Sequence, residues 1–518
     1  MRVRRLCTLV CVLAMLFALA PIRAGCASDA VTQDEASELL DAQSRSEYAL
    51  LIGVDHFVSR ADTYPSSTNN VNAMQEVFQG ALNPFRAIIV PPNPVTTVEQ
   101  LTALVQKTFG AAGKNDVCYL YLSTHGVYDP ASGQEPLLLL SDGQTENGIT
   151  PAQLEAAFDG ILGTKVIILD ACNSGAFIGK GLPSLPQEVH FLGDDFKVIT
   201  SSGAREESWY WSAGEDAKQE ERQGAFYFTQ ALCDALSASC GYPADQNHDG
   251  SITLKEIYDY LLLNHAASTP QVYPQNDDDF VIFRYDPLDP LPTGLERSPI
   301  MDVTFSDLVL DQDSREITIE YIAMRPVRVA YQLVYRREGR WEFENAQLIY
   351  DDSERFSAFG DQEGAVSAGW KQRTLRLDEL ADDAYGYALV QLVSIDRGKL
   401  RVHAGRVLCV LPEEEPPAPT VEISGSFAPE TGRELAVFVG HNSPCTLSVA
   451  ILDEEGQVVE RLCHRRSTRP MGLAGTTLYW DGKQRDGSPA PAGTYRVRTQ
   501  IHWKGQTLSV ESETFELE

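Results

Sequence analysis

Short apolar runs alternate with helical patterns from Tyr48 onwards, and this alternation constrains the fold more than any other feature. The strand-like runs are 48–54, 87–90, 117–122, 137–140, 165–169 and 196–200. Helical periodicity or a helix-start signal marks 71–78, 96–109, the segment from Thr150, 225–236 and 254–263. Apolar runs of this length are typical of strands buried on both faces. The pattern therefore predicts an α/β domain over residues 48–286, with a mainly parallel sheet flanked by helices.

Two of the predicted strands end in residues that can do chemistry. The run 117–122 is followed by Ser123, Thr124, His125 and Gly126, and the run 165–169 by Asp170, Ala171 and Cys172. Parallel sheets place functional residues at the carboxyl ends of their strands. A thiolate that attacks a carbonyl needs an imidazole to protonate the leaving amine, and backbone donors for the oxyanion. A lone cysteine or histidine is more often a core residue, but a cysteine and a histidine that each follow a predicted strand indicate a Cys-His dyad.

Five segments resemble the caspase-like cysteine peptidases, the group that includes caspases, metacaspases, legumain and clostripain. They occur in the family's order, at 48–54, 119–126, 167–175, 200–208 and 224–229, so the resemblance spans about residues 48–285. It implies that Cys172 is the nucleophile, that His125 is its acid–base partner and that the Gly126 N–H contributes to the oxyanion hole. It also implies hydrolysis of polypeptide substrates after one chosen P1 residue.

The P1 residue stays open between a basic side chain and an Asn or Asp. In metacaspases an acidic pocket accepts Arg or Lys, and Asp170 and Ser123 match two of its residues. A carboxylate pairs with guanidinium or ammonium, so Asp170 favours a basic P1. A further family aspartate stands in an Asn-Asp pair, where this sequence has Asn69-Asn70. An aspartate in a strand-end turn explains Asp170 equally well, and cleavage after Asn or Asp, as in legumain or caspases, is the alternative.

Residues 245–256 match an EF-hand calcium loop at every fixed position. The expected oxygen donors are Asp245, Asn247, Asp249, Ser251, Thr253 and Glu256, with Gly250 at the sharp turn. The helix that normally precedes such a loop is not evident, because Cys240-Gly-Tyr-Pro intervenes. A single Ca²⁺ is therefore expected, in a stabilising role, and an Asx-rich turn that caps the next helix is the alternative. No organic cofactor is expected.

Beyond residue 286 the sequence changes to short strands in which apolar and polar residues alternate. This pattern predicts two all-β sandwich domains, at 300–412 and 420–518. Proline-rich linkers at 287–292 and 413–419 separate these parts. The segment 478–495 contains Trp480 and the turn glycines Gly482, Gly487 and Gly493. It resembles the immunoglobulin-like module of flagellar hook-capping proteins, in which Trp480 would be a core residue. Such a module binds a partner or acts as a spacer between domains, and the resemblance does not imply a role in flagella.

The first 25 residues have the order of a secretory signal peptide. Three arginines in residues 1–5 precede an apolar run from Leu6 to Ala20, which is too short for a comfortable membrane span. Residues 23–26 partly resemble a lipoprotein cleavage box, but Arg23 stands where an apolar residue is expected, so a lipid anchor at Cys26 is not favoured. No later stretch is long and apolar enough to span a bilayer. Residues 26–47 form a polar lead-in to a secreted or cell-surface protein.

The formal net charge of −31 argues against nucleic acid as a partner, because phosphate contacts need clustered Lys and Arg. The ten cysteines are scattered, without the spacing of a disulfide scaffold or a metal site. Pairing of Cys445 with Cys463 stays open. The charged loop 205–222 is expected to be a solvated connection, with a mobile substrate loop or a self-processing site as the alternatives. The sequence thus favours a secreted bacterial cysteine endopeptidase, and the competing interpretation is a non-catalytic surface binding protein with a degenerate peptidase domain.

Overall fold

The computed structural model describes residues 45–517, apart from short gaps at 183–185, 187, 213–223, 266–267, 288–297, 307–308, 311–314, 338–339, 342–344, 353, 355–362, 378–385, 397–398, 411–417, 425–426, 442–444, 468–474 and 504–505. The expected signal peptide, Cys26, most of the lead-in and most of both linkers lie outside the described residues. Within the described part of the chain, no helix is long and apolar enough to cross a membrane.

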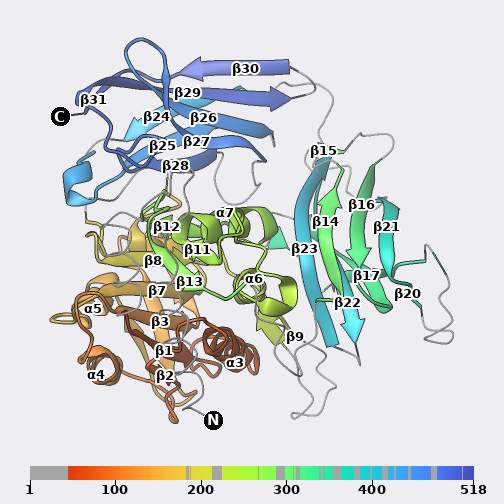
Figure 1. Ribbon diagram of the computed structural model, residues 1–518, viewed down its shortest axis with the longest axis horizontal. Helices are drawn as coiled ribbons and strands as arrows, with labels where there is room; N and C mark the ends of the chain where they lie inside the picture. Colours follow the sequence, from red (N-terminus) through yellow and green to blue (C-terminus); the bar gives the residue numbers. More distant parts are fainter. Residues whose placement is uncertain are drawn as a thin grey trace, which may run out of the picture. The chain divides into compact units, whose positions relative to one another are not determined.

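A six-stranded sheet organises the first part of the chain (Figure 1). Its order is β12-β8-β7-β3-β1-β2. The strands are β1 (Glu47–Gly53), β2 (Ala87–Ile89), β3 (Val117–Ser123), β7 (Thr164–Asp170), β8 (Phe196–Thr200) and β12 (Gln271–Tyr273). All neighbours pair in parallel except β12, which is antiparallel to β8. The predicted, mainly parallel sheet is therefore present, with one antiparallel edge strand.

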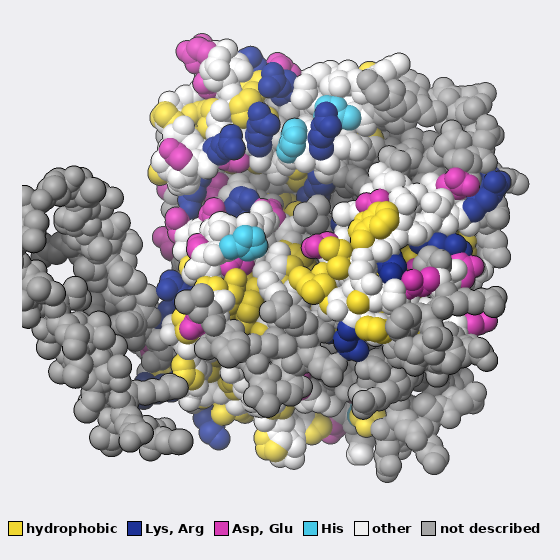
Figure 2. All heavy atoms as spheres, turned by 45° about the vertical axis from the view of Figure 1, so that its right-hand side comes forward, with side chains coloured by type: hydrophobic (Ala, Val, Ile, Leu, Met, Phe, Trp, Pro, Cys, Tyr) yellow, Lys and Arg dark blue, Asp and Glu magenta, His cyan; other side chains and the backbone are white. Residues whose placement is uncertain are grey.

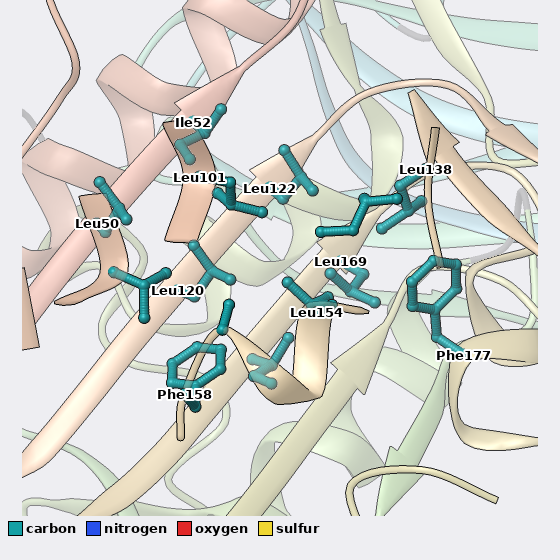
Figure 3. Close-up of a cluster of buried hydrophobic side chains, with 14 of the residues drawn as sticks. Leu50, Ile52, Leu101, Leu120, Leu122, Leu138, Leu154, Phe158, Leu169 and Phe177 are labelled. Atoms are coloured by element: carbon teal, nitrogen blue, oxygen red, sulfur yellow. The ribbon is translucent and has the colours of Figure 1, made fainter. Parts of the chain in front are cut away.

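Helices cover both faces of this sheet (Figure 1). They are α3 (Ser66–Gln79), α4 (Val98–Phe109), α5 (Pro151–Ala156), α6 (Tyr227–Ala235) and α7 (Leu254–Asn264). Successive side chains of a strand point to opposite faces. Leu50 and Ile52 accordingly pack with α4 and α5, as Figure 3 shows, whereas Ala49 and Leu51 pack with α3, α6 and α7. The continuous apolar runs of the sequence are apolar because both faces are buried.

Side-chain caps start several helices where the sequence places them. Thr150 caps α5 in a capping box with Gln153, and Thr253 caps α7 in a capping box with Glu256. The prediction that 225–236 is helical throughout is wrong at its start. Residues Gly224–Phe226 form β10, which pairs with β9 (Tyr210–Ser212), and two asparagine side chains bond the backbone of Gly224 and Phe226. These partners satisfy backbone groups that a longer helix would otherwise use.

Shorter elements complete the first part. A three-stranded sheet contains β4 (Gly126–Val127), β5 (Leu137–Ser141) and β6 (Glu146–Ile149), and β11 (Ser251–Thr253) pairs with β13 (Val281–Arg284). Two 3₁₀ helices, η1 (Ser174–Ile178) and η2 (Ala238–Cys240), follow β7 and α6. β4 and η1 matter most here, because they begin one and two residues after His125 and Cys172 respectively.

From residue 300 onwards the chain is built of strands that pair antiparallel, except for β15 with β23. The first group contains β14 (Ile300–Phe305), β15 (Val309–Leu310), β16 (Glu316–Ala323), β17 (Val327–Arg337), β18 (Arg340–Trp341), β19 (Gln347–Tyr350), β20 (Ala365–Val366), β21 (Gly369–Arg376), β22 (Gly386–Asp396) and β23 (Lys399–Val410). It forms the sheet β14-β16-β21 and a seven-stranded sheet around β17, β22 and β23. One hydrophobic core lies among these strands.

A last group of strands, together with η5, is called here the C-terminal β segment (residues 418–517). It contains β24 (Thr420–Ser424), η5 (Pro429–Thr431), β25 (Leu435–Gly440), β26 (Thr446–Leu452), β27 (Val458–Ser467), β28 (Gly475–Trp480), β29 (Gly493–Trp503), β30 (Gln506–Glu511) and β31 (Phe515–Leu517). Trp480 is fully buried in its core, as predicted, and donates its indole N–H to the Lys483 carbonyl. Cys445 and Cys463 are both free thiols.

Basic side chains gather on the sheet of the C-terminal β segment in spite of the acidic composition (Figure 2). Arg461 and Arg498 both lie next to Ala450 in the strand register. The pKa of His502 is lowered by burial and by the nearby Arg465 and His464. The acidic excess of the chain is therefore not spread evenly over its surface.

Candidate active site

The register of β3 and β7 brings His125 and Cys172 to one edge of the sheet. Ser123 lies beside Asp170, so the residues two positions further on leave the sheet at the same level. A Cβ atom on Gly126 would lie only 1.7 Å from the carbonyl oxygen of Cys172. The backbone that follows the histidine therefore touches the backbone of the cysteine. Both His125 and Cys172 are half-buried and reach the surface.

A backbone carbonyl orients the His125 ring. Its Nε2 lies 2.9 Å from the carbonyl oxygen of Ala61, and the Phe57 ring packs 4.4 Å from the imidazole centre. A carbonyl only accepts hydrogen bonds, so Nε2 carries the hydrogen and Nδ1 of the neutral ring keeps a lone pair. Burial lowers the pKa of His125. The resting imidazole at neutral pH is therefore uncharged, with Nδ1 able to accept a proton.

The thiol of Cys172 lies against the backbone of Ser208. The Ser208 amide nitrogen is 3.4 Å from Sγ, and its carbonyl oxygen is 3.5 Å away. Burial raises the pKa of Cys172 to about 11. A thiol with this pKa is protonated at neutral pH. The resting pair is thus a neutral thiol and a neutral imidazole, and nucleophilic attack requires a base to take the thiol proton as attack begins.

The segment after Cys172 is tightly bound to its surroundings. Asn173 takes a left-handed conformation with φ 58° and donates its backbone N–H to the Glu206 carbonyl. A Cβ on Gly175 would lie 2.7 Å from the carbonyl oxygens of Lys180 and Ser202, so only glycine fits there. The turn that carries the nucleophile is therefore fixed by neighbouring backbone, which includes the loop after β8.

Asp170 and Ser123, the residues expected to contact P1, are both fully buried. Asp170 accepts hydrogen bonds from Ser208 Oγ at 2.9 Å and from Thr229 Oγ1 at 2.6 Å. Burial raises the pKa of Asp170 to about 6. Ser123 Oγ lies 3.2 Å from both Ser67 Oγ and Asn70 Nδ2. The carboxylate thus lies one layer beneath the thiol, covered by hydroxyl groups.

Several contributing residues were not identified from the sequence. Asp55, just beyond β1, accepts hydrogen bonds from the Ser67 and Thr68 amides at the start of α3, each at 2.8 Å. It also bonds the Thr63 hydroxyl, next to the loop that holds Ala61. A strand-end aspartate was a visible signal for Asp55. Ala61 acts through its backbone carbonyl, so no side-chain pattern identifies it.

The predicted calcium loop folds around Asp245. Its carboxylate accepts hydrogen bonds from the amides of His248, Asp249 and Gly250 and from the Tyr285 hydroxyl at 2.6 Å. Gly250 has φ 85°, as the sharp turn requires. The remaining predicted donors lie in the same loop or in the first turn of α7: Asn247, Asp249, Ser251, Thr253 and Glu256. The Asp249 carboxylate accepts hydrogen bonds from the Ser251 amide and the Asn247 side chain. Among the described residues, no group of three or more His, Cys, Asp or Glu is arranged to hold a metal.

The donor chemistry of this loop suits Ca²⁺, but Asp245 is already well supplied with protein donors. Its two oxygens together accept four hydrogen bonds, which is about the full capacity of a carboxylate. An ion would have to replace or share some of these bonds. The loop is an Asx-rich turn in which Thr253 caps α7 and Glu256 completes the capping box.

Comparison with known proteins supports a caspase-like peptidase domain. Residues 46–259, less than half of the chain, match the family model described as the caspase domain. The match begins within two residues of the first predicted strand and includes His125 and Cys172. No curated protein matches the chain.

Among solved structures, protein GSU0716 from Geobacter sulfurreducens is 16% identical, with a TM-score of 0.31, over 49% of this chain and 98% of that one. The YadV chaperone is 14% identical, with a TM-score of 0.25, over 42% of this chain and 100% of that one. Latent dimeric PorU from Porphyromonas gingivalis is 12% identical, with a TM-score of 0.17, over 63% of this chain and 30% of that one. Likenesses at TM-scores this low support no conclusion about fold or function.

Proposed function

We propose that this chain is a secreted cysteine endopeptidase in which Cys172 is the nucleophile and His125 the acid–base residue. The observation that carries the proposal is the contact between Gly126 and the Cys172 carbonyl oxygen at one edge of the sheet. It lies inside the segment that matches the caspase domain. The orientation of His125 by Ala61 supports the same roles, since it leaves Nδ1 free to accept a proton.

The proposed reaction follows from the neutral resting pair. A substrate carbonyl carbon approaches Sγ while Nδ1 of His125 takes the thiol proton, and the Gly126 N–H stabilises the oxyanion. The imidazolium then protonates the leaving amine, and the C–N bond breaks to give a thioester. Water attacks the thioester with His125 as base, which releases the carboxylic acid and restores the thiol.

For the P1 residue we propose Arg or Lys, with Asp170 and Ser123 contributing to the pocket. The support is the position of Asp170, two residues before the nucleophile and beneath it, where its charge attracts a cationic side chain. The burial of Asp170 beneath two hydroxyl groups favours a second candidate, an Asn or Asp P1 that would be bound by hydroxyl and amide groups. Asn70, which bonds Ser123, would belong to such a neutral pocket.

A panel of fluorogenic peptides that vary only at P1 tests both candidates. If Asp170 binds a basic P1, the ratio of kcat/KM for Arg over Asn falls as the pH drops through about 6, because the carboxylate becomes protonated. Asp170→Asn should then lose the Arg preference at every pH. An Asn or Asp preference in the wild-type protein that Asp170→Asn leaves unchanged assigns the second candidate.

The peptidase proposal itself is tested by Cys172→Ala and His125→Ala, which should each abolish turnover. Cys463→Ala is a matched control, because Cys463 is also half-buried and burial also raises its pKa to about 11. The control should retain full activity. Absence of turnover for every P1 residue in the wild-type protein, under reducing conditions and with Ca²⁺, would favour a non-catalytic binding protein instead.

We also propose the remaining roles from the sequence features. The strands at 300–412 and 420–518 are proposed as two β-sandwich domains, the second immunoglobulin-like, that bind or space rather than catalyse. Ca²⁺ at the 245–256 loop is proposed as a stabilising ion. Export by the N-terminal leader is proposed to place the enzyme outside the cytoplasm, and recovery of the protein in culture medium or at the cell surface tests this.

A further inference from the structure

A buried charge pair joins the segment that follows the nucleophile to the C-terminal β segment. Lys180 Nζ forms an ion pair with the Glu434 carboxylate. The Lys180 side chain is 2% exposed and the Glu434 side chain 4%. Lys180 Nζ also donates to the Val272 carbonyl at 2.6 Å and lies 4.4 Å from the centre of the Tyr479 ring. Burial lowers the pKa of Lys180 and raises that of Glu434. Two such groups stay charged in a dry site only while each has the other as partner.

Lys180 is directly tied to the backbone around Cys172. Its N–H donates to the Gly175 carbonyl at 2.8 Å, three residues after the nucleophile. Its carbonyl accepts the Ala204 N–H at 2.9 Å, at the start of the loop that leads to Ser208. Ser208 in turn contacts Sγ. Lys180 therefore lies between the two chain segments that hold the thiol.

Neighbouring contacts reinforce the same junction. The Gly181 N–H donates to the Tyr479 hydroxyl at 2.8 Å, and the Thr477 hydroxyl donates to the Leu182 carbonyl at 2.7 Å. Glu434 also accepts the Gln275 N–H at 2.9 Å. The residues that hold Gly181, Leu182 and Lys180 in this way lie outside residues 46–259, the segment that matches the caspase domain: Gln275, Glu434, Thr477 and Tyr479. The support of the nucleophile segment thus extends into a part of the chain that the family model does not include.

We propose that Glu434 is a positioning residue for Cys172, so that the C-terminal β segment completes the active site by holding Lys180 and the turn after the nucleophile. The inference rests on the proposed peptidase function. A loosened junction frees residues 173–182 and displaces Sγ from His125. Activity therefore depends on the C-terminal β segment through this junction.

The test compares two full-length variants that each break a buried Lys–carboxylate pair. Glu434→Gln breaks the pair at the nucleophile segment. Asp277→Asn breaks the pair of Lys197 and Asp277, whose side chains are 10% and 8% exposed. Lys197 lies beside Val166 near the start of β7, whereas Cys172 follows the end of that strand. Each variant is studied well below its own melting temperature. Hydrogen exchange of the amides of residues 173–182 is measured, together with the maximal rate of inactivation by the peptidyl inhibitor that the wild-type protein accepts best.

We expect Glu434→Gln to accelerate exchange at 173–182 and to lower the maximal inactivation rate, each by about tenfold or more, as misplacement of a reacting group does. Asp277→Asn should change neither by more than about twofold. The double variant Lys180→Met with Glu434→Leu should restore both values in part, because a packed apolar pair can replace a buried ion pair, although the Val272 carbonyl and the Gln275 N–H each lose a partner. Should Glu434→Gln not fold, Tyr479→Phe, which removes the hydroxyl that bonds the backbone of Gly181 and of its neighbour Leu182, should show the same two effects at smaller size.

Equal effects in Glu434→Gln and Asp277→Asn, or wild-type values in Glu434→Gln, overturn the proposal. A wild-type protein that the inhibitors never label refutes the proposed function instead. In that case hydrogen exchange still decides whether Glu434 holds the nucleophile segment.

Discussion

Replacement of Gly126 by alanine should disable the proposed active site with little change elsewhere. The added Cβ would lie 1.7 Å from the Cys172 carbonyl oxygen and 2.8 Å from its carbonyl carbon. The first distance is half of the 3.4 Å at which ordinary contact begins. Both atoms belong to backbone that the turn after Cys172 holds in place, so neither can rotate away. Either the His125 segment or the Cys172 segment has to move by more than an ångström.

The size of the effect follows from that movement. A misplacement of about 1 Å between reacting groups costs about 10²-fold in rate. At about 1.36 kcal/mol for each factor of ten, this corresponds to about 2.7 kcal/mol of lost transition-state stabilisation. Overpacking in a well-packed region costs a further ~1–3 kcal/mol of folding stability. Gly126→Ala should therefore fold at moderate temperature but lose at least about 99% of its kcat/KM.

The assay is kcat/KM on the best P1 substrate, combined with thermal unfolding of the same samples. Gly113→Ala is the matched control, because its Cβ would meet its nearest neighbour, Asp116 Oδ2, at an ordinary 3.7 Å. The control should keep activity within about twofold of the wild-type protein. Wild-type kcat/KM and wild-type melting temperature in Gly126→Ala would refute the reasoning, since the two backbones would then not touch in solution.

Three further predictions concern pH and calcium. Because burial raises the pKa of Cys172 to about 11, its alkylation by iodoacetamide should accelerate about tenfold per pH unit from pH 7 to 10; a plateau already at pH 6 would indicate a thiolate–imidazolium pair instead. His403 is half-buried, and burial together with the nearby Arg401 lowers its folded-state pKa well below the ordinary histidine value of about 6.5. The unfolded chain therefore binds more protons, and stability is lost as the pH falls below about 6.5. In urea titrations His403→Gln should remove about 1.4 kcal/mol per pH unit from that loss, and an unchanged slope would contradict this. Saturating Ca²⁺ should raise the melting temperature of the wild-type protein but not of Asp249→Asn; equal shifts would exclude the 245–256 loop as the site.

The sequence predicted the parts of the fold that hydrophobic patterning controls. Leu120 and Tyr121 are neighbours in a continuous apolar run because one faces α4 and α5 and the other faces α3 and α6. Such a run, repeated between helical patterns, is sufficient to predict a parallel sheet covered on both faces. Thr150 marked a helix start correctly, because the capping box is a local interaction.

Features that depend on distant partners were not predicted. Gly224–Phe226 forms a strand because Asn69, Asn70 and β9 bond its backbone, and nothing local distinguishes it from the first turn of α6. The antiparallel β12 is only three residues long, too short for a periodic signal.

The site shows the same division. His125 and Cys172 were identifiable because each lies two residues after a strand of the same sheet. The Ala61 carbonyl and the ion pair of Lys180 with Glu434 join residues separated by long stretches of chain, so only the folded structure brings them together.

The proposed peptidase depends above all on Cys172 as its reactive thiol. The most direct measurement is peptide mapping by mass spectrometry after the full-length protein has reacted with an irreversible peptidyl inhibitor. We expect one adduct per chain, on the peptide that contains Cys172, and we expect His125→Ala to abolish it. An adduct on Cys240 or Cys463 with Cys172 unmodified would contradict the account.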